Sequence, residues 1–309
     1  MYSYTNIVGN FVFNQNFKIR EKILFKNRDI PFLQNDQIDN KLAKKFKNIM
    51  DIQENTKFRR KIDEELRSYK TEFYKNNLEL TKSQIQQSIT LDLLIIQVSN
   101  TINELNKTIN ILIKRLREWY SYVLPEIESI VSDNRQFAEI IQKTRNSLIN
   151  KYNIKESMGI SLDKKDQDAI ISLSNIVLSQ FEEKDYLETY LEKLMEKSCP
   201  NLTAVAGFSI GARLIAYAGS LKKLAFMPAS TIQILGAEKA LFRHMTTGAK
   251  PPRHGIIVNH PLISGKPQKE HGKRARALAD KISLAVKIDY FKGKFIGRKL
   301  EKELKERFS

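Results

Sequence analysis

Apolar residues recur every third or fourth position between residues 95 and 119, with polar residues between them. The spacing alternates between three and four without a break along Ile95, Val98, Ile102, Leu105, Ile109, Leu112, Leu116 and Trp119. Heptad spacing sustained over this length is typical of a helix in a coiled coil. Pro125 is expected to end or kink this helix.

Two more helical stretches are expected downstream. One covers roughly residues 126–150, and a longer one begins near Asp163, a suitable N-cap residue with Asp166 three positions on. Two long helices joined by a connector predict an antiparallel coiled-coil hairpin. The seam from Ile95 to Leu116 could pair within one chain only. We also expect it to support a homodimer, since apolar residues outside the seam, such as Ile96 and Ile111, need cover too.

The first 25 residues show a different pattern. Apolar residues alternate with polar ones in places along residues 6–14 and 17–25, on either side of Asn14-Gln15-Asn16. This pattern predicts a β-hairpin. An isolated hairpin is marginally stable, so it needs further packing or a partner. Residues 27–60 are polar and show no clear pattern.

Glycine usage divides the chain. Ten of the 12 glycines lie after position 200, whereas residues 57–198 contain only Gly159 and Pro125 as strong helix breakers. We therefore expect a mainly α fold with a small hairpin-containing N-terminal α/β domain, long antiparallel coiled-coil helices and a compact C-terminal all-α domain. The expected domains are residues 1–60, 61–198 and 199–309.

Helix boundaries in the last domain can be placed from single residues. Gly207 and Gly211 form a GxxxG pair in a helix rich in small residues, which indicates close helix packing. Gly219 is expected to stop that helix, and Ser220 to start the next one, over residues 221–226. A further helix is expected over residues 236–245, with Leu241 and Met245 on the face that enters the core.

Positive charge is concentrated in this last domain. The chain has a net charge of +17, of which +14 lies within residues 200–309. Charge this dense attracts a polyanion. A solubility surface or a codon bias toward lysine is the alternative, but a codon bias should act along the whole chain, and residues 1–199 carry only +3.

Several cations stand where a phosphate could bind. Lys239 and Arg243 share one helix face, close to the backbone N–H groups of a helix that starts near Gly236. Lys250 to His254 form a proline-stiffened loop, in which His254, like His260 beyond it, could stack on unpaired bases. Both features also fit solvated surface residues.

A second basic cluster precedes an apolar helix face. Lys273, Arg274 and Arg276 are expected in its first turn, where the helix dipole disfavours cations, so a phosphate partner explains them better than folding does. The apolar face comprises Ala275, Leu278, Ala279, Ile282, Ala285 and Val286. Gly272-Lys273 lacks the spacing and the following Ser/Thr of a nucleotide-binding phosphate loop.

Other classes of protein are disfavoured. No apolar run is long enough to cross a membrane, and the first residues do not match a signal peptide. A single cysteine fits a reducing cytoplasm. We expect no cofactor, no metal site and no enzyme activity. Glu238 and His244 could be considered as a catalytic acid/base pair acting on RNA. They lie about 120° apart on a helix, however, and no nucleophile or metal-ligand set accompanies them.

Four segments, in order, resemble the Nop domain. They are NLTAVAGFSIGARLI, SLKKLAFMPASTIQILGAEKALFRHM, PPRHGIIVNHPLI and GKRARALADKISLAVKID, across residues 200–290. The segments 92–97 and 105–120 resemble the coiled-coil entry of the same family, and residues 6–25 its N-terminal start. Met245 stands where the family's segment GAEKALFRHL has Leu, which is a tolerable apolar exchange.

The resemblance implies a scaffold of an archaeal box C/D guide ribonucleoprotein. The N-terminal domain would hold fibrillarin, a methyltransferase to which the cofactor S-adenosylmethionine belongs. The coiled coil would pair two copies, and the C-terminal domain would bind a kink-turn guide RNA together with a ribosomal-protein-like partner. Charge and resemblance together assign RNA binding to Gly236, Ala237, Glu238, Lys239, Arg243, His244, Lys250, Arg253, His254, Lys273, Arg274 and Arg276.

Two departures from the family pattern bear on this expectation. The segment before the coiled coil is short, so the alternative is a Nop relative that binds RNA but has lost or weakened its fibrillarin contact. The sequence also shows no long lysine-rich tail of the eukaryotic nucleolar kind, which favours an archaeal form, and we expect a cytoplasmic location.

Overall fold

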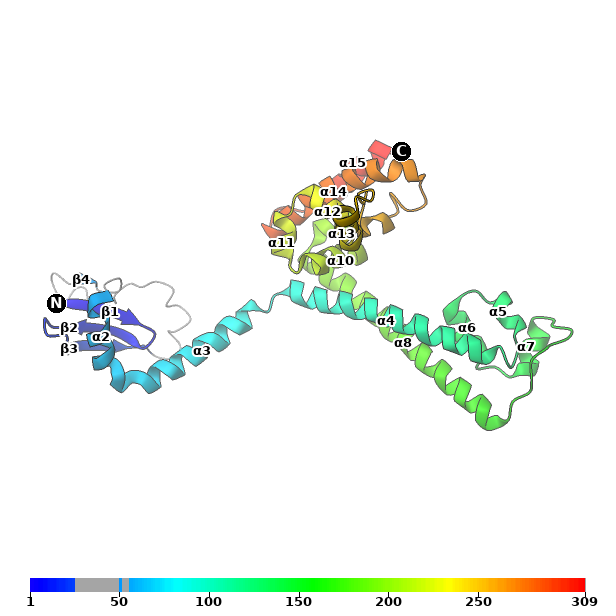
Figure 1. Cartoon of the computed structure of the whole chain (residues 1–309), viewed down its shortest axis with the longest axis horizontal. Coiled ribbons are helices and arrows are strands. Elements are labelled where there is room, and N and C mark those ends of the chain that lie inside the picture. The colour runs from blue at the N-terminus through cyan, green and yellow to red at the C-terminus, as the bar shows by residue number, and fades with distance from the viewer. Residues whose placement is uncertain (26–49, 52–55, 309) are drawn as a thin grey trace. The chain divides into compact units, whose positions relative to one another are not determined.

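The chain forms two compact units, Met1–Thr90 and Leu91–Ser309 (Figure 1). A computed structural model describes residues 1–25, 50–51 and 56–308. The fold is mainly α, with one small sheet near the N-terminus, as the sequence predicts. The boundary at residue 90 differs from the expected division at 60 and 198. The expected division at 198 is absent because Ile102 and Met195 of the long helices share a core with the helices after residue 200.

The first unit contains a four-stranded sheet with strand order β3-β2-β1-β4. The predicted hairpin corresponds to β2 (Gly9–Phe13) and β3 (Ile19–Leu24), which pair antiparallel. Before it, β1 (Tyr2–Asn6) pairs antiparallel with β2, and the short β4 (Met50–Asp51) pairs parallel with β1.

The expected single strand over residues 6–14 is wrong, because the chain reverses after Asn6. The Asn6 side-chain oxygen accepts hydrogen bonds from the backbone N–H groups of Val8, at 2.8 Å, and Gly9, at 3.2 Å. A Cβ atom at Gly9 would lie 2.2 Å from the Ile23 carbonyl oxygen, so only glycine fits this position.

Helices complete the first unit. They are α2 (Thr56–Glu65), the 3₁₀ turn η2 (Leu66–Tyr69) and α3 (Lys70–Ser88). The core is aromatic: the Phe17 ring stacks on Tyr2, with centroids 5.3 Å apart, and on Phe58, at 4.8 Å. The hairpin thus has the additional packing that it needs. Most of the unpatterned segment 27–60 lies outside the described residues.

The second unit begins with the predicted antiparallel hairpin of long helices. Helices α4 (Leu91–Tyr120) and α8 (Lys164–Ser198) lie side by side (Figure 1), and Asp163 is the N-cap residue of α8, as predicted. The heptad seam faces inward: Ile95, Ile102, Ile109 and Leu116 are buried, and Val98, Leu105 and Leu112 are half-buried. The predicted seam therefore packs within one chain.

The buried stripe of α4 drifts at its C-terminal end. Ile113 and Tyr120 are buried there, and Trp119, the last residue of the heptad series, is 40% exposed. A straight α-helix has 3.6 residues per turn, so a seven-residue series rotates slowly off the buried face.

Three short helices follow α4: α5 (Glu126–Ile130), α6 (Asn134–Ile140) and α7 (Arg145–Lys151). The single helical stretch expected over 126–150 is therefore wrong. The Asp133 side chain accepts from the Gln136 N–H at 2.7 Å and starts α6. The Arg117 guanidinium donates to the carbonyls of Val131 and Ser132, at 3.0 and 3.1 Å, and holds the break open.

The C-terminal part of the second unit is all α. Its elements are α9 (Pro200–Ala206), α10 (Phe208–Ala218), α11 (Leu221–Phe226), α12 (Ala229–Ile234), α13 (Glu238–Thr247), η3 (Ile256–Asn259), α14 (Gln268–Tyr290) and α15 (Gly297–Phe308). The predicted apolar face of α14, Ala275 to Val286, is buried in the core shared with Ile95 and Met195.

Single residues set these helix ends. Gly219, with φ of 81°, ends α10, and the Ser220 side chain accepts from the Lys223 N–H at 3.1 Å to start α11, as predicted. The first helix of this part, expected to be continuous, is broken at Gly207, whose φ is 77°. The Asp289 carboxylate accepts from the N–H groups of Asn201 and Leu202 at the start of α9.

Candidate nucleic-acid interface

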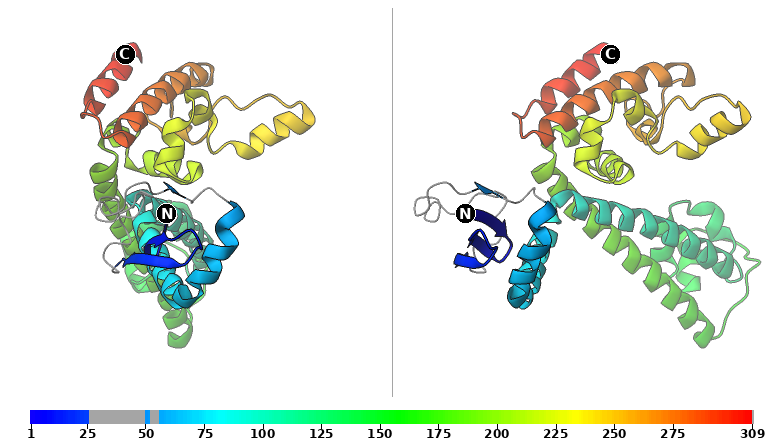
Figure 2. Two further views of the ribbon diagram at one scale, coloured as in Figure 1. Left: turned by 90° about the vertical axis from the view of Figure 1, so that its left-hand side faces the viewer. Right: turned by 60° about the vertical axis from the view of Figure 1, so that its left-hand side comes forward.

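Helix α13 stands away from the other helices of the C-terminal part. In both views of Figure 2 the yellow helix projects from its neighbours, and no residue of α13 is buried. The expectation that Leu241 and Met245 enter the core is wrong: Leu241 is half-buried and Met245 is 75% exposed. Phe242, at 68%, is equally open. Their exposure makes this side of α13 a candidate contact surface for a partner.

A side chain of α13 already binds one backbone N–H group at the start of this helix. The helix begins at Glu238, two residues later than predicted, and Gly236 donates its N–H to the Glu238 carboxylate at 2.8 Å. This carboxylate takes the place of one phosphate oxygen, so the helix N-terminus is a weaker anion site than predicted. Lys239 and Arg243, four residues apart, are both exposed, and neither side chain forms an ion pair with a described residue.

A basic cleft lies where the loop after α13 meets the start of α14. Its volume is about 610 Å³. It is lined by Gln233, Lys250, Pro251, Pro252, Arg253, Lys269, Gly272 and Arg276. The structure thus brings together three predicted residues from distant parts of the sequence, Lys250, Arg253 and Arg276.

Two lining residues with polar or charged side chains, Gln233 and Lys269, are missing from the sequence-based assignment. Lys269 belongs to the same run of cations as Lys273, so its charge was a usable signal. Gln233 had no such signal: it lines the cleft because its side chain donates to the Arg253 carbonyl at 2.6 Å, and its carbonyl accepts from the Gly255 N–H at 2.7 Å. These two bonds fix the loop that carries Arg253.

The histidines near the cleft have partners in the fold. His244 Nδ1 contacts the Ala249 carbonyl, which closes the turn after α13. The rings of His254 and His271 lie 5.6 Å apart, and burial together with the neighbouring His271 lowers the pKa of His254. Burial also lowers the pKa of His260. At neutral pH, His254 and His260 are therefore expected to be uncharged, so neither adds to the positive charge of the cleft.

The three cations of the second cluster differ in their surroundings. Helix α14 begins at Gln268, so Lys273, Arg274 and Arg276 lie beyond its first turn, and the dipole argument for a phosphate does not apply. Arg274 pairs with Glu270 at 2.8 Å and lies over the Phe308 ring, and its side chain is only 11% exposed. Lys273 and Arg276 are exposed.

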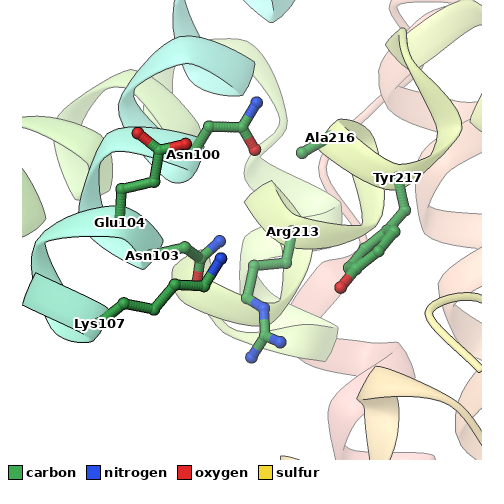
Figure 3. Close-up of a pocket in the computed structure, with 7 residues that line it drawn as sticks. All are labelled: Asn100, Asn103, Glu104, Lys107, Arg213, Ala216 and Tyr217. Carbon is green, nitrogen blue, oxygen red and sulfur yellow. The ribbon is translucent and has the colours of Figure 1, made fainter. Parts of the chain in front are cut away.

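A second polar groove lies between α4 and α10 (Figure 3). Its volume is about 320 Å³, and Lys107, Arg213 and Tyr217 line it with Asn100, Asn103, Glu104 and Ala216. The Arg213 Nε is buried and has no hydrogen-bond partner among the described residues. The Glu104 carboxylate shares the groove, so the charge there is more balanced than in the basic cleft.

Two kinds of site are absent from the described part of the chain. Within residues 1–25, 50–51 and 56–308, no three His, Cys, Asp or Glu residues gather as a metal site would require. No helix among these residues is long and apolar enough to span a membrane.

Comparison with known proteins shows the family to which the chain belongs. A family model described as "Nop: snoRNA binding domain, fibrillarin" matches residues 101–309. The chain belongs to the Nop family. The match spans the coiled-coil hairpin from residue 101 onward and all helices of the C-terminal part, and so includes α13 and the basic cleft.

Individual Nop proteins are similar over most of this chain. An uncharacterized NOP5 family protein of Methanocaldococcus jannaschii is 44% identical over 247 residues, which cover 74% of this chain and 59% of that protein. Nucleolar protein 56 of Mus musculus is 37% identical over 243 residues, or 71% of this chain and 42% of that protein. The chain thus spans less than two thirds of the length of either relative.

A solved structure gives a more distant likeness. A crystal structure titled as a fibrillarin/Nop5p complex aligns over 99% of this chain and 98% of that chain, at 21% identity and a TM-score of 0.46. This likeness is too low to relate the two proteins in function.

Proposed function

We propose that this chain is a non-catalytic RNA-binding scaffold of an archaeal box C/D guide ribonucleoprotein. It contacts a kink-turn guide RNA together with the ribosomal-protein-like protein already bound there. The observation that carries this proposal is the basic cleft beside the exposed helix α13, within the part of the chain that matches the snoRNA-binding domain.

Phosphates would bind to the exposed cations. Lys250, Arg253 and Arg276 converge on the cleft, with Lys269 as a fourth cation. Their positive charge is not neutralised by ion pairs with described residues, so a phosphate backbone would find four available donors. Lys239 and Arg243 extend the basic surface along α13.

The protein partner would contact the apolar side of α13. Phe242 and Met245 are exposed on the same helix as Lys239 and Arg243, so one element offers both apolar and cationic contacts. A surface of this composition fits a joint RNA and protein partner better than RNA alone. We therefore expect weak binding to bare RNA and tight binding to the preformed RNA–protein complex.

Fibrillarin, with its S-adenosylmethionine, would bind the first unit. Helix α3 supports this because it exposes Phe73, Tyr74 and Leu78, at 47%, 71% and 43%. Fibrillarin positioned in this way would methylate ribose 2′-hydroxyl groups in rRNA or tRNA. The alternative is a Nop relative with a lost or weakened fibrillarin contact. A pull-down of fibrillarin by the full chain and by a Phe73→Ala, Tyr74→Ala variant distinguishes the two.

Homodimerisation stays a prediction, but the seam residues are no longer the surface on which we expect a second copy to bind. The seam residues Ile95, Val98, Ile102, Leu105, Ile109, Leu112 and Leu116 pack inside the hairpin of one chain. A second copy would have to use outward-facing residues such as Ile111 on α4, 64% exposed, and Ile176 on α8, 49% exposed.

A gel-shift titration tests the RNA-binding proposal. The full chain is titrated into a kink-turn RNA, alone and with its bound protein, over a range of salt concentrations. The logarithm of the binding constant should fall with the logarithm of the salt concentration, with a slope of magnitude about 0.7–0.9 per phosphate neutralised. The double variant Lys239→Ala, Arg243→Ala should make this slope shallower. Lys164→Ala with Lys165→Ala, at the start of α8, is the control: it removes two other exposed cations that form no ion pair with a described residue, and it should change little. Equal affinity for bare RNA and the complex would contradict the proposal.

A further inference from the structure

Three aromatic rings form an exposed cluster on the C-terminal part of the second unit. Phe226 ends α11, while Tyr290 and Phe291 end α14. Their ring centroids lie 5.8 Å (Phe226–Tyr290), 6.2 Å (Phe226–Phe291) and 5.0 Å (Tyr290–Phe291) apart, all edge to face. Phe226 is 64% exposed and Phe291 is 66% exposed, whereas Tyr290 is half-buried and anchors the cluster in the core. We call these three residues the aromatic patch.

Burial does not explain the patch. Two phenylalanines that remain about two-thirds exposed contribute little to the core, and their apolar surface stays in water. The rings are also held in place by helix ends that pack together, since α11 contacts α14 along the core. A preformed group of open ring faces and edges is what a stacking partner requires.

Lysines flank the patch along both helices that carry it. Lys222 and Lys223 are exposed one helical turn before Phe226. Lys287 is exposed one turn before Tyr290 and Phe291, and the exposed Lys292 follows Phe291 directly. None of these ammonium groups pairs with a carboxylate among the described residues. The nearest acidic residue in sequence, Asp289, is turned to the N–H groups at the start of α9. At the other end of α11, Asp92 accepts from the Leu221 N–H.

The patch is separate from the basic cleft. Arg276 lines the cleft near the start of α14, and Tyr290 lies 14 residues further along the same helix. At 1.5 Å per residue this is a distance of about 20 Å, too far for one nucleotide to contact both.

We propose that the aromatic patch binds a single-stranded RNA segment, whose bases stack on Phe226 and Phe291 and whose phosphates contact the surrounding lysines. Open aromatic rings among cations of one sign match this ligand, because every base has a stacking face and every nucleotide carries a negative charge. A protein partner would have to bring carboxylates to four lysines and apolar groups to the rings. The proposal rests on the proposed RNA-binding function and adds a second, unpaired part of the RNA to it.

The test uses the full chain and a fluorescently labelled ten-nucleotide oligouridine, measured by anisotropy at low salt. Phe226→Ala with Phe291→Ala should weaken binding by about tenfold or more, since each lost stack is worth about 1–3 kcal/mol. Phe226→Tyr with Phe291→Tyr keeps the rings and should keep the affinity. Tyr186→Ala, which removes a 66% exposed ring from α8, is the matched control and should change nothing.

A second pair of variants tests the lysines. Lys222→Ala with Lys287→Ala should lower the salt slope of oligouridine binding while the rings stay in place. This pair also keeps the proposal testable if the phenylalanine variant unfolds.

The outcomes separate this proposal from the proposed function. Lys239→Ala with Arg243→Ala should lose the kink-turn complex and keep oligouridine binding, and the aromatic variant should do the reverse. Oligouridine binding that is absent, or indifferent to both the ring and the lysine variants, overturns the aromatic patch as an RNA site. If the Phe226→Ala, Phe291→Ala variant instead lost the kink-turn complex and kept oligouridine binding, the patch would be a protein-binding surface, and the proposal would also be overturned.

Discussion

Arg274 and Arg276 are two residues apart on α14, and the structure gives them different surroundings. Arg274 pairs with Glu270 and lies 4.8 Å from the Phe308 ring centroid, whereas Arg276 is exposed and lines the basic cleft. Charge alone cannot distinguish them in the sequence. The distinction depends on Phe308, which is more than 30 residues away and reaches Arg274 only through the packing of α15 on α14.

We predict opposite effects of removing these two arginines. Arg274→Ala should lower the free energy of unfolding by about 1–3 kcal/mol, because a charged hydrogen bond and a ring contact are lost. It should leave the salt slope of RNA binding unchanged. Arg276→Ala should change stability by less than about 0.5 kcal/mol and lower the slope by about 0.7–0.9. Urea unfolding and salt-dependent gel shifts measure the two quantities. A lower slope for Arg274→Ala would place that residue at the RNA.

The single cysteine gives a second prediction at this scale. Burial raises the pKa of the Cys199 thiol to about 12. The thiolate is the reactive form, so the folded protein should not react with a disulfide reagent at pH 8, and the unfolded protein should react at once. The unfolded thiol ionises above its ordinary pKa of about 8.5, whereas the folded thiol stays protonated up to about 12. Ionisation therefore favours the unfolded state, and the free energy of unfolding falls as pH rises above about 8.5. Rapid labelling without denaturant would contradict the buried position.

At the scale of elements, helices were predictable where one local signal decides them. Ser220 and Gly219 place a boundary, and the heptads of α4 predict a long helix, because both effects act within a few residues. The split of residues 126–150 into three helices was only partly predictable: Asp133 is a local cap for α6, but Arg117 fixes the break before it from a different helix. The cleft likewise depends on Gln233, whose hydrogen bonds reach 20 residues along the chain.

The apolar side of α13 gives a prediction about partners. Phe242→Ala with Met245→Ala should leave the melting temperature almost unchanged, because neither side chain is buried. Affinity for the RNA–protein complex should fall about tenfold or more, as expected for an aromatic contact at an interface, while affinity for bare RNA stays the same. Met158→Ala, at a residue that is 90% exposed, is the control. Unchanged affinity for the complex would mean that α13 does not contact the protein partner.

The coiled-coil hairpin gives a prediction about self-association. Ile109 is 3% exposed, so Ile109→Ala should destabilise the second unit by about 2–5 kcal/mol without changing the oligomeric state. Ile111→Lys, on the outward face, should leave stability nearly intact and lower the dimer fraction. Light scattering on a sizing column measures both. A dimer lost in the Ile109 variant and kept in the Ile111 variant would return the contact to the seam.

At the scale of the whole molecule, the two units have separate cores. The core of the first unit is small and aromatic, with Phe11 fully buried and edge-on to Tyr69 at 5.4 Å. The second unit has two core clusters: one joins the coiled coil to the helices around the cleft, with Leu278 fully buried, and the other packs the far ends of α4 and α8 against the helices between them. A change in one core should therefore act on one unit and on the partner proposed for it.

We predict that the two proposed partners can be lost independently. Phe11→Ala should destabilise the first unit by about 3–5 kcal/mol, so that one calorimetric transition moves to lower temperature and the other stays. Fibrillarin capture should fall while affinity for the RNA–protein complex is kept. Leu278→Ala should do the reverse, because α14 supports the cleft. If Phe11→Ala weakened both interactions equally, the first unit would have to stabilise the RNA-binding surface, and the two cores would act as one.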